Sequence, residues 1–150
     1  MRIVAPLTDA ERAGFIAAAR DLVGVPFRHR GRSLRGVDCV GAVALALASV
    51  GRSVQDRPHY GRNPVNDGLR EVCRAHFGDP IPVADMRAGD VALIARHDDV
   101  RNHEPNHVGI LFDHPNGGLA MVHALKQNQR VIAHRLEAVH FARIVAVFRP

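Results

Sequence analysis

Cys39 is the residue of this 150-residue chain best suited to covalent chemistry. It follows Asp38, a good N-cap, and opens a predicted helix, residues 39 to about 50, that is apolar on nearly every face. At a helix start the dipole lowers a thiol pKa, and unpaired backbone N–H groups can stabilise an oxyanion. Gly36 and Gly41 permit close approach of a substrate or a neighbouring strand. The alternative is a small buried core cysteine.

Two histidines supply the base that such a thiol needs. The segment HPNGG at residues 114–118 reads as a turn, and pairing His107 with His123 centres the hairpin on residue 115. Directly opposed residues share a face, so these two rings are expected to be neighbours. One would act as base toward Cys39, and the other would orient it. The alternative for each histidine alone is a partly buried strand residue. The opposite face would hold Val108, Ile110, Phe112, Ala120, Val122 and Ala124.

The string HExxH at residues 103–107 is the zinc-peptidase motif, which requires a helix. Pro105 would cost a helix about 3 kcal/mol, and the flanking residues read as loop and strand. We therefore predict neither zinc catalysis nor a cofactor. A structural metal on His97, His103 and His107 stays open, although no Cys or carboxylate spacing supports it.

The net charge of +5 comes almost entirely from arginine, since Lys126 is the one lysine. Four arginines fall in residues 28–35, which predicts either an electrostatic surface for an anionic partner or a solvated loop. Without a nucleic-acid motif or any Trp, we expect no specific nucleic-acid partner. Cys73 lies in a polar helix candidate and is predicted to be a structural or incidental thiol.

The elements that position these residues divide the chain into two halves. A capping box, Thr8 to Glu11, opens a helix that ends near Gly24. Loops are predicted at 28–37 and 52–64, and a third helix at about 66–77. Five strand-like runs follow at 91–95, 108–112, 119–124, 130–135 and 142–148. Helices followed by strands predict an α+β fold in one domain, residues 1–150, with the Cys39 helix packed on a mainly antiparallel sheet of five to six strands.

Four motifs occur in a family-like order and spacing: GVDCVG at 36–41, GDVALI at 89–94, HVGIL at 107–111 and VHA at 122–124. Together they resemble the NlpC family of papain-like cell-wall cysteine peptidases, over about residues 11–149. The branch carried by tailed phages and gene transfer agents is the most similar. Its basic stretch before the cysteine resembles residues 28–33, and its ending resembles residues 143–149.

The resemblance implies a role for each site residue. Cys39 would be the nucleophile, His107 the general base and His123 the third, orienting residue. Asp38 matches a position implicated in recognising a free amine of the substrate. Family members cleave peptidoglycan stem peptides, typically between D-glutamate, through its γ-carboxyl, and diaminopimelate.

Two positions depart from the family pattern. Many members have Tyr where Phe27 stands and Ser where Val40 stands. Each change removes a polar substrate contact, so the two bear on which bond is cleaved more than on the Cys–His chemistry. They also keep open a catalytically weak or inactive structural hub of a tail. Acyl transfer by the same thiol is a further alternative.

The resemblance also implies partners and a place of action. We expect stem peptides and phage-like tail proteins as partners. The first residues lack a secretory signal pattern, and no apolar run is long enough to span a membrane. The expected route is synthesis in the cytoplasm, incorporation in a phage-like particle and action in the periplasm or cell wall.

Overall fold

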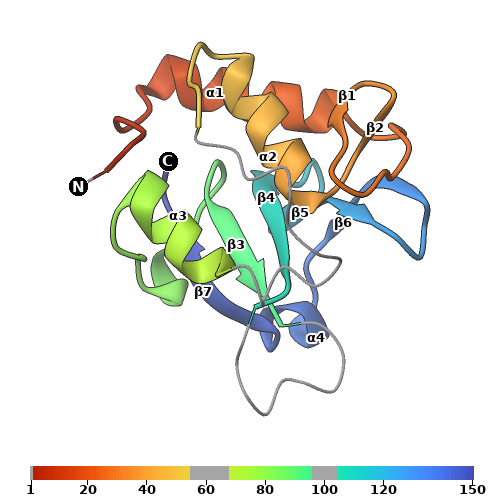
Figure 1. Ribbon diagram of the computed structural model, residues 1–150. Helices are drawn as coiled ribbons and strands as arrows, with labels where there is room; N and C mark the ends of the chain where they lie inside the picture. Colours follow the sequence, from red (N-terminus) through yellow and green to blue (C-terminus); the bar gives the residue numbers. More distant parts are fainter. Residues whose placement is uncertain (1, 55–67, 96–104) are drawn as a thin grey trace.

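The computed structural model describes residues 2–54, 68–95 and 105–150 and contains an α+β fold. Helices α1 (Asp9–Asp21) and α2 (Cys39–Ala48) lie together over one face of a five-stranded sheet, as Figure 1 shows. Helix α3 (Leu69–Phe77) lies beside β7. No helix in these three ranges is long and apolar enough to cross a bilayer.

The starts of α1 and α2 have the predicted caps. Thr8 Oγ1 accepts a hydrogen bond from the Glu11 N–H at 3.1 Å, and the Thr8 N–H donates to the Glu11 carboxylate at 3.3 Å. Asp38 caps α2 by accepting from the Gly41 N–H at 2.8 Å. These bonds satisfy donors that a helix start leaves unpaired. Both predicted helix starts are confirmed.

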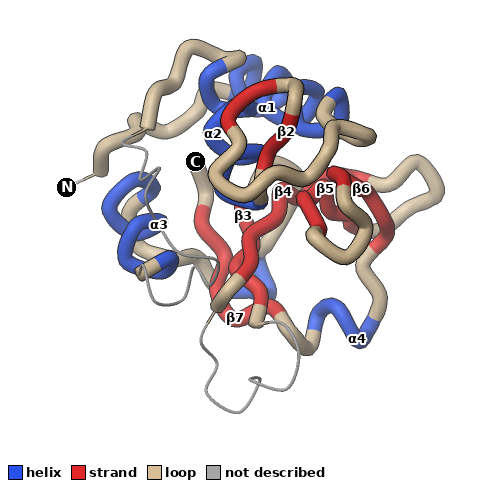
Figure 2. The backbone as a smooth tube through the Cα atoms, turned by 45° about the vertical axis from the view of Figure 1, so that its right-hand side comes forward, coloured by secondary structure: helices blue, strands red, loops and turns tan. Residues whose placement is uncertain are grey.

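The sheet is antiparallel throughout and has the order β6-β5-β4-β3-β7. Its strands are β3 (Val91–Ile94), β4 (His107–Asp113), β5 (Leu119–Leu125), β6 (Arg130–Arg135) and β7 (Ile144–Phe148). Strands β3 to β6 form a meander, and β7 returns to pair with β3 (Figure 2). The five predicted strands are confirmed to within two residues at each end.

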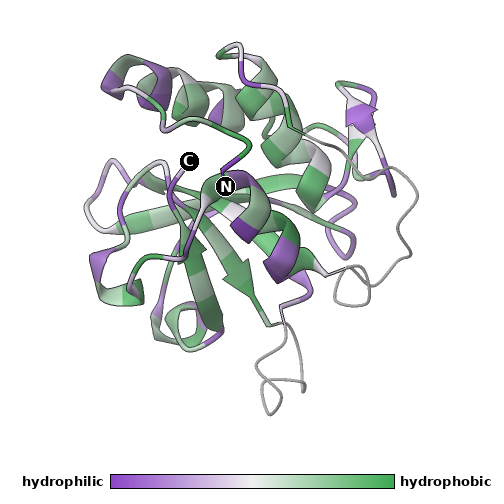
Figure 3. Cartoon of the chain, turned by 60° about the vertical axis from the view of Figure 1, so that its left-hand side comes forward, coloured by the Kyte–Doolittle hydropathy of each residue, from purple (hydrophilic) through white to green (hydrophobic). Residues whose placement is uncertain are grey.

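Alternation along the strands separates two apolar layers. The layer that meets the helices includes Val108, Ile110, Phe112, Ala120, Val122 and Ala124, together with residues of α1 and α2. The opposite face carries a smaller cluster around Ala92, Leu111 and Met121. Figure 3 shows the hydropathy of these strands and of α2. The predicted division of faces is therefore confirmed.

The register of the β4–β5 hairpin differs from the prediction by two residues. Asp113 pairs with Leu119 and Leu111 pairs with Met121, so the centre is residue 116 rather than 115. The reason is the turn: Gly117 and Gly118 both have positive φ, and the His114 N–H donates to the Gly118 carbonyl. His107 is thus not opposite His123. An offset of two keeps both residues on one face.

Smaller differences concern short elements. The predicted loop 28–37 contains a hairpin of β1 (Arg32–Ser33) and β2 (Gly36–Val37). A four-residue helix, α4 (Ala138–Phe141), precedes β7 and was not predicted. The predicted loop at 52–64 and helix start at 66 fall mostly outside the described residues, which resume at residue 68.

Candidate active site

Cys39 lies in the first turn of α2 with its thiol against the start of β4. The backbone N–H groups of Val108, Val40 and Cys39 itself donate toward the sulfur. Val108 directly follows His107 in β4, so the strand that carries the predicted base also supplies a backbone N–H to the predicted nucleophile. The cysteine is 7% exposed.

The geometry of β4 explains why an N–H is directed at the thiol. The Leu111 N–H donates to the Asp90 carbonyl on the β3 side at 2.9 Å. Successive residues of a strand face opposite edges, so the Val108 N–H faces the β5 side. Pairing of β4 with β5 runs from Ile110 to Asp113, however. The start of β4 is therefore available to the first turn of α2. The N–H groups that a helix start leaves unpaired can also stabilise an oxyanion.

The expected low pKa of the Cys39 thiol is wrong for this structure. Burial, and secondly the negative charge of Asp38, raise the pKa of Cys39 to about 12. The N–H groups around the sulfur act in the opposite direction without outweighing burial. The helix-dipole argument omitted the packing of α2 against the sheet, which removes water from the thiol. The raised pKa favours the protonated thiol, so attack by this sulfur would require a base to take its proton.

His107 and His123 are in direct contact. Nε2 of His107 lies 2.7 Å from Nδ1 of His123, and the ring planes are inclined by 63°. The two residues are 3% and 5% exposed. Their rings contact on the face opposite Val108, as the sequence predicts, although the residues meet diagonally across the two strands.

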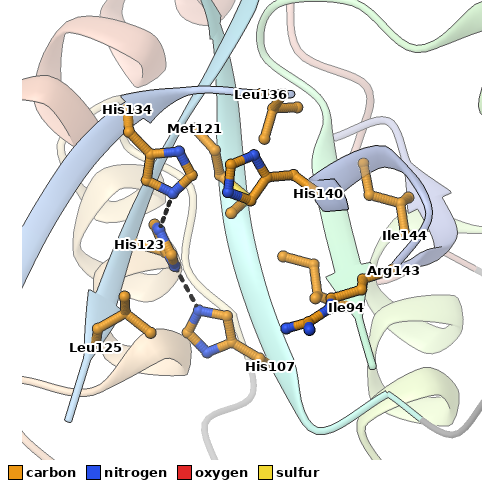
Figure 4. A pocket seen from close by; sticks show the side chains of 10 residues that line it. All are labelled: Ile94, His107, Met121, His123, Leu125, His134, Leu136, His140, Arg143 and Ile144. Carbon is orange, nitrogen blue, oxygen red and sulfur yellow. Dashed lines mark hydrogen bonds between the residues drawn. The ribbon is translucent and has the colours of Figure 1, made fainter. Parts of the chain in front are cut away.

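A third histidine, His134, extends the His107–His123 pair into a row and was not predicted as a site residue. Nε2 of His123 lies 2.8 Å from Nε2 of His134 on β6, and His140 of α4 contacts His134 with ring centroids 4.6 Å apart (Figure 4). The sequence placed His134 on a strand. Its contact with His123 depends on the β5–β6 register, in which His134 is opposite Met121.

The four histidines line a cavity of about 200 Å³ on this face of the sheet, together with Arg143 and apolar side chains (Figure 4). Met121 packs over Gly109, where a Cβ would overlap the Met121 side chain. Gly109 therefore leaves room for Met121 to form part of the cavity wall.

Asp38 is tied into the protein by three donors. Its carboxylate accepts from the Gly41 N–H at 2.8 Å, the Arg30 N–H at 2.9 Å and the Arg32 guanidinium at 3.0 Å. Asp38 is 4% exposed. A Cβ at Gly41 would overlap the Gly31 carbonyl, so the glycine permits close approach of this loop. Part of the basic segment 28–35 is thus internal structure, and the assigned amine recognition by Asp38 stays a prediction.

Phe27 and Val40 are partly buried and pack against the core. The backbone of Phe27 lies next to Val37 through a parallel bridge, and its N–H donates to the Gln129 carbonyl at 2.9 Å. Val40 is the second residue of α2, and Phe27 lies next to Val37, shortly before the start of that helix. Their assigned contacts with substrate stay predictions.

The HExxH string is described only from Pro105 onward, because His97, His103 and Glu104 lie outside the described residues. His107 opens β4, so the described end of the string leads into a strand rather than a helix. Within the described ranges, no group of three or more His, Cys, Asp or Glu side chains could hold a metal ion.

Cys73 is a second free thiol, buried in α3. Burial, and secondly Cys39, raise its pKa to about 12. The prediction of a structural or incidental thiol stays untested.

Comparison with known proteins identifies a family and several solved structures that are similar to this chain. The NlpC/P60 family model matches residues 24–149. The chain is similar in structure to an NLP/P60 lipoprotein-like protein of Staphylococcus aureus, with TM-score 0.65 and 15% identity over 97% of this chain and 43% of that chain. No curated protein matches the chain in sequence.

Two further structures are similar over nearly the whole chain. One is the P60 domain of an antigen from Mycobacterium avium subspecies paratuberculosis, with TM-score 0.63 and 19% identity over 93% of this chain and 94% of that one. The other is RipB, a peptidoglycan hydrolase from Mycobacterium tuberculosis, with TM-score 0.63 and 21% identity over 95% of this chain and 68% of that one. At these identities the structures establish a common fold. Together with the family-model match over residues 24–149, they show that the chain belongs to the NlpC/P60 family of papain-like cysteine peptidases.

Proposed function

We propose that this chain is a cysteine peptidase that hydrolyses peptide bonds in peptidoglycan stem peptides, of the γ-D-glutamyl-diaminopimelate type. The observation that carries the proposal is the Cys39 thiol held among N–H groups, one of them from Val108, which directly follows His107 of the buried His107–His123 pair. Membership of the NlpC/P60 family supports a cell-wall substrate.

The reaction begins with proton transfer from the Cys39 thiol to His107 as the sulfur attacks the carbonyl carbon. The backbone N–H groups at the start of α2 stabilise the oxyanion. His107 returns the proton to the leaving amine, and the C–N bond breaks to give a thioester on Cys39. Water then attacks the thioester, with His107 again as base, and the thiol is regenerated. The balance is one water consumed and one peptide bond cleaved.

The pKa of Cys39 bears on the first step. The raised pKa of the buried thiol favours proton transfer to His107 as the sulfur attacks. His123 holds the His107 ring through the 2.7 Å hydrogen bond and stabilises the imidazolium that forms.

We further propose that the enzyme acts in the periplasm or cell wall as part of a phage-like tail or gene transfer agent. The support is the sequence resemblance of residues 28–33 and 143–149 to that branch. Sedimentation of the protein with phage-like particles from its source organism tests this association, and recovery only in the particle-free fraction contradicts it.

Digestion of diaminopimelate-containing peptidoglycan, followed by mass spectrometry of the released fragments, tests the activity. Wild type and Cys73→Ser should release the same stem-peptide fragments, and Cys39→Ser should release none. Identical fragments from wild type and Cys39→Ser would refute thiol catalysis. An added amine acceptor that becomes joined to the product would indicate acyl transfer instead. If peptidoglycan stays intact with the wild type and with every variant, the result would indicate a structural tail component instead of an enzyme.

A further inference from the structure

His134 links the buried His107–His123 pair to the molecular surface. Nε2 of His123 lies 2.8 Å from Nε2 of His134, whose Nδ1 lies 2.8 Å from the Arg135 carbonyl oxygen. His107 and His123 are almost fully buried, whereas His134 is half-buried. One row of ring nitrogens therefore leads from the buried His107–His123 pair to the half-buried His134, as the dashed lines in Figure 4 show.

The hydrogen bond to the Arg135 carbonyl determines which ring nitrogen donates in each contact of this row. A carbonyl oxygen only accepts, so Nδ1 of His134 carries a hydrogen. A neutral His134 then has its lone pair on Nε2 and accepts from the Nε2–H of His123. By the same reasoning His123 accepts at Nδ1 from the Nε2–H of His107. The basic nitrogen of His107 is consequently Nδ1.

We infer that His134 is a positioning residue, which fixes the tautomer of His123 and through it the basic nitrogen of His107. It also shares the positive charge that arises when His107 takes the proton of Cys39. That proton enters at Nδ1 of His107 and leaves to the departing amine, so the row gains and loses one proton in acylation and again in deacylation. The catalytic part of this role depends on the proposed function, whereas the tautomers do not.

The charged and titratable groups around His134 are compatible with this role. The His140 ring from α4 packs 4.6 Å away and accepts the Glu137 N–H at its Nδ1. Burial, and then His134 and Arg143, lower the pKa of His140, while Glu137 opposes them. His140 is therefore neutral near pH 7 and adds no positive charge against the row. Among the described residues, the other titratable or charged groups that line this cavity are His107, His123 and the cationic Arg143.

Histidine tautomers can be read directly in the wild-type protein. Two-bond nitrogen–hydrogen NMR spectra of protein with 15N-labelled histidine, recorded near pH 8, should show the Nδ1–H form for His134. They should show the Nε2–H form for His123 and His107. An Nε2–H tautomer at His134 overturns the inference, whether or not the protein cleaves peptidoglycan.

Two variants test the consequence for activity. His134→Phe keeps a ring but has no acceptor, so kcat/KM should fall about ten- to a hundred-fold, as for other residues that orient a reacting group. The acid limb of its kcat/KM–pH profile should move to lower pH, because the imidazolium of His107 loses the acceptor row. His134→Gln keeps an acceptor oxygen and should stay within a few-fold of wild type. His114→Gln, in the β4–β5 turn, should match wild type.

The inference fails if His134→Phe keeps wild-type activity. It also fails if the Phe and Gln variants lose the same activity with an unmoved acid limb, since that result is expected of a residue that only packs. Loss of folding in His134→Phe would be evident from circular dichroism. In that case the tautomers measured in the wild type test the inference. An inactive wild type would refute the proposed function while leaving the tautomer measurement informative.

Discussion

Nε2 of His107 lies 2.7 Å from Nδ1 of His123, although the two residues are not opposed in the β4–β5 ladder. The ladder places Asp113 opposite Leu119, and its continuation would place His107 opposite Leu125. The contact is diagonal, two residues along the strand, a separation that ring side chains can bridge. The Val108 N–H, one residue after His107, is directed at Cys39, so the pair is the first target for mutation.

Removing the proposed base, His107, should lower kcat/KM more than removing its partner, His123. His107→Ala eliminates the acceptor for the Cys39 proton and should lower kcat/KM on a stem-peptide substrate by about 10²- to 10⁴-fold. His123→Asn keeps a side-chain oxygen that can accept from His107, so its loss should be smaller than that of His123→Phe. Steady-state kinetics on the purified variants measures this order.

Cys73→Ser serves as the control for that series, because Cys73 takes no part in the proposed reaction. Equal activities of the Asn and Phe variants at position 123 would show that its polar contact has no role in orienting His107. Wild-type activity in His107→Ala would remove His107 from the mechanism.

Neutralising Asp38 should make Cys39 more acidic. The carboxylate is the second cause of the raised thiol pKa, after burial. Asp38→Asn removes this charge while an amide oxygen can still accept from the Gly41 N–H. The ultraviolet absorbance of the thiolate, titrated against pH in a Cys73→Ala background, should therefore rise at lower pH than in the parent.

Asp113→Asn, at the exposed end of β4, is the matched control because it removes an equal charge away from the thiol. Its titration should coincide with that of the parent. A thiol pKa in Asp38→Asn that is unchanged or higher would show that the Asp38 charge does not act on Cys39.

The two buried thiols should destabilise the fold at alkaline pH. Their folded-state pKa of about 12 lies above the unfolded value, so their contribution is complete below the unfolded pKa. It is lost as pH rises from about 9 toward 12, because the unfolded state ionises first. Each thiol adds a slope of at most about 1.4 kcal/mol per pH unit to the free energy of unfolding. Urea unfolding between pH 8 and 10 should show a shallower decline for Cys73→Ala than for wild type. Parallel declines would show that Cys73 ionises equally in both states.

Gly41→Ala should disturb both the fold and the site. The added Cβ would overlap the Gly31 carbonyl and approach the Asp38 carboxylate, so the loop over the start of α2 must move. We expect a loss of about 1–3 kcal/mol in the free energy of unfolding, as for overpacked cores, together with lower activity. Gly51→Ala has open space but a φ of 77°, so it should cost about 1 kcal/mol and leave activity unchanged. Equal activities of the two variants would show that the loop position is irrelevant to catalysis.

Local signals were sufficient to predict much of this fold. The Thr8–Glu11 capping box and the alternation of Val108, Ile110 and Phe112 depend on residues close in sequence, and the structure confirms both. The pairing of the two site histidines needed only that they share a face, which survives a register offset of two.

Other features depend on distant parts of the chain and escaped prediction. Helix α4 spans four residues, too few for a period, and is capped by reciprocal bonds between Glu137 and His140. The raised pKa of Cys39 reflects burial under tertiary contacts. The contact of His134 with His123 follows from the β5–β6 register, which no single segment encodes.

The histidine row crosses three neighbouring strands of the sheet. Ring centroids are 5.0 Å apart between His107 and His123 and 4.9 Å apart between His123 and His134. Each contact is diagonal, and residues so placed lie about 7–8 Å apart, so the side chains themselves close the distance between the rings. One histidine per strand, offset by two residues at each step, therefore suffices to form a continuous row of hydrogen-bonded rings across an antiparallel sheet.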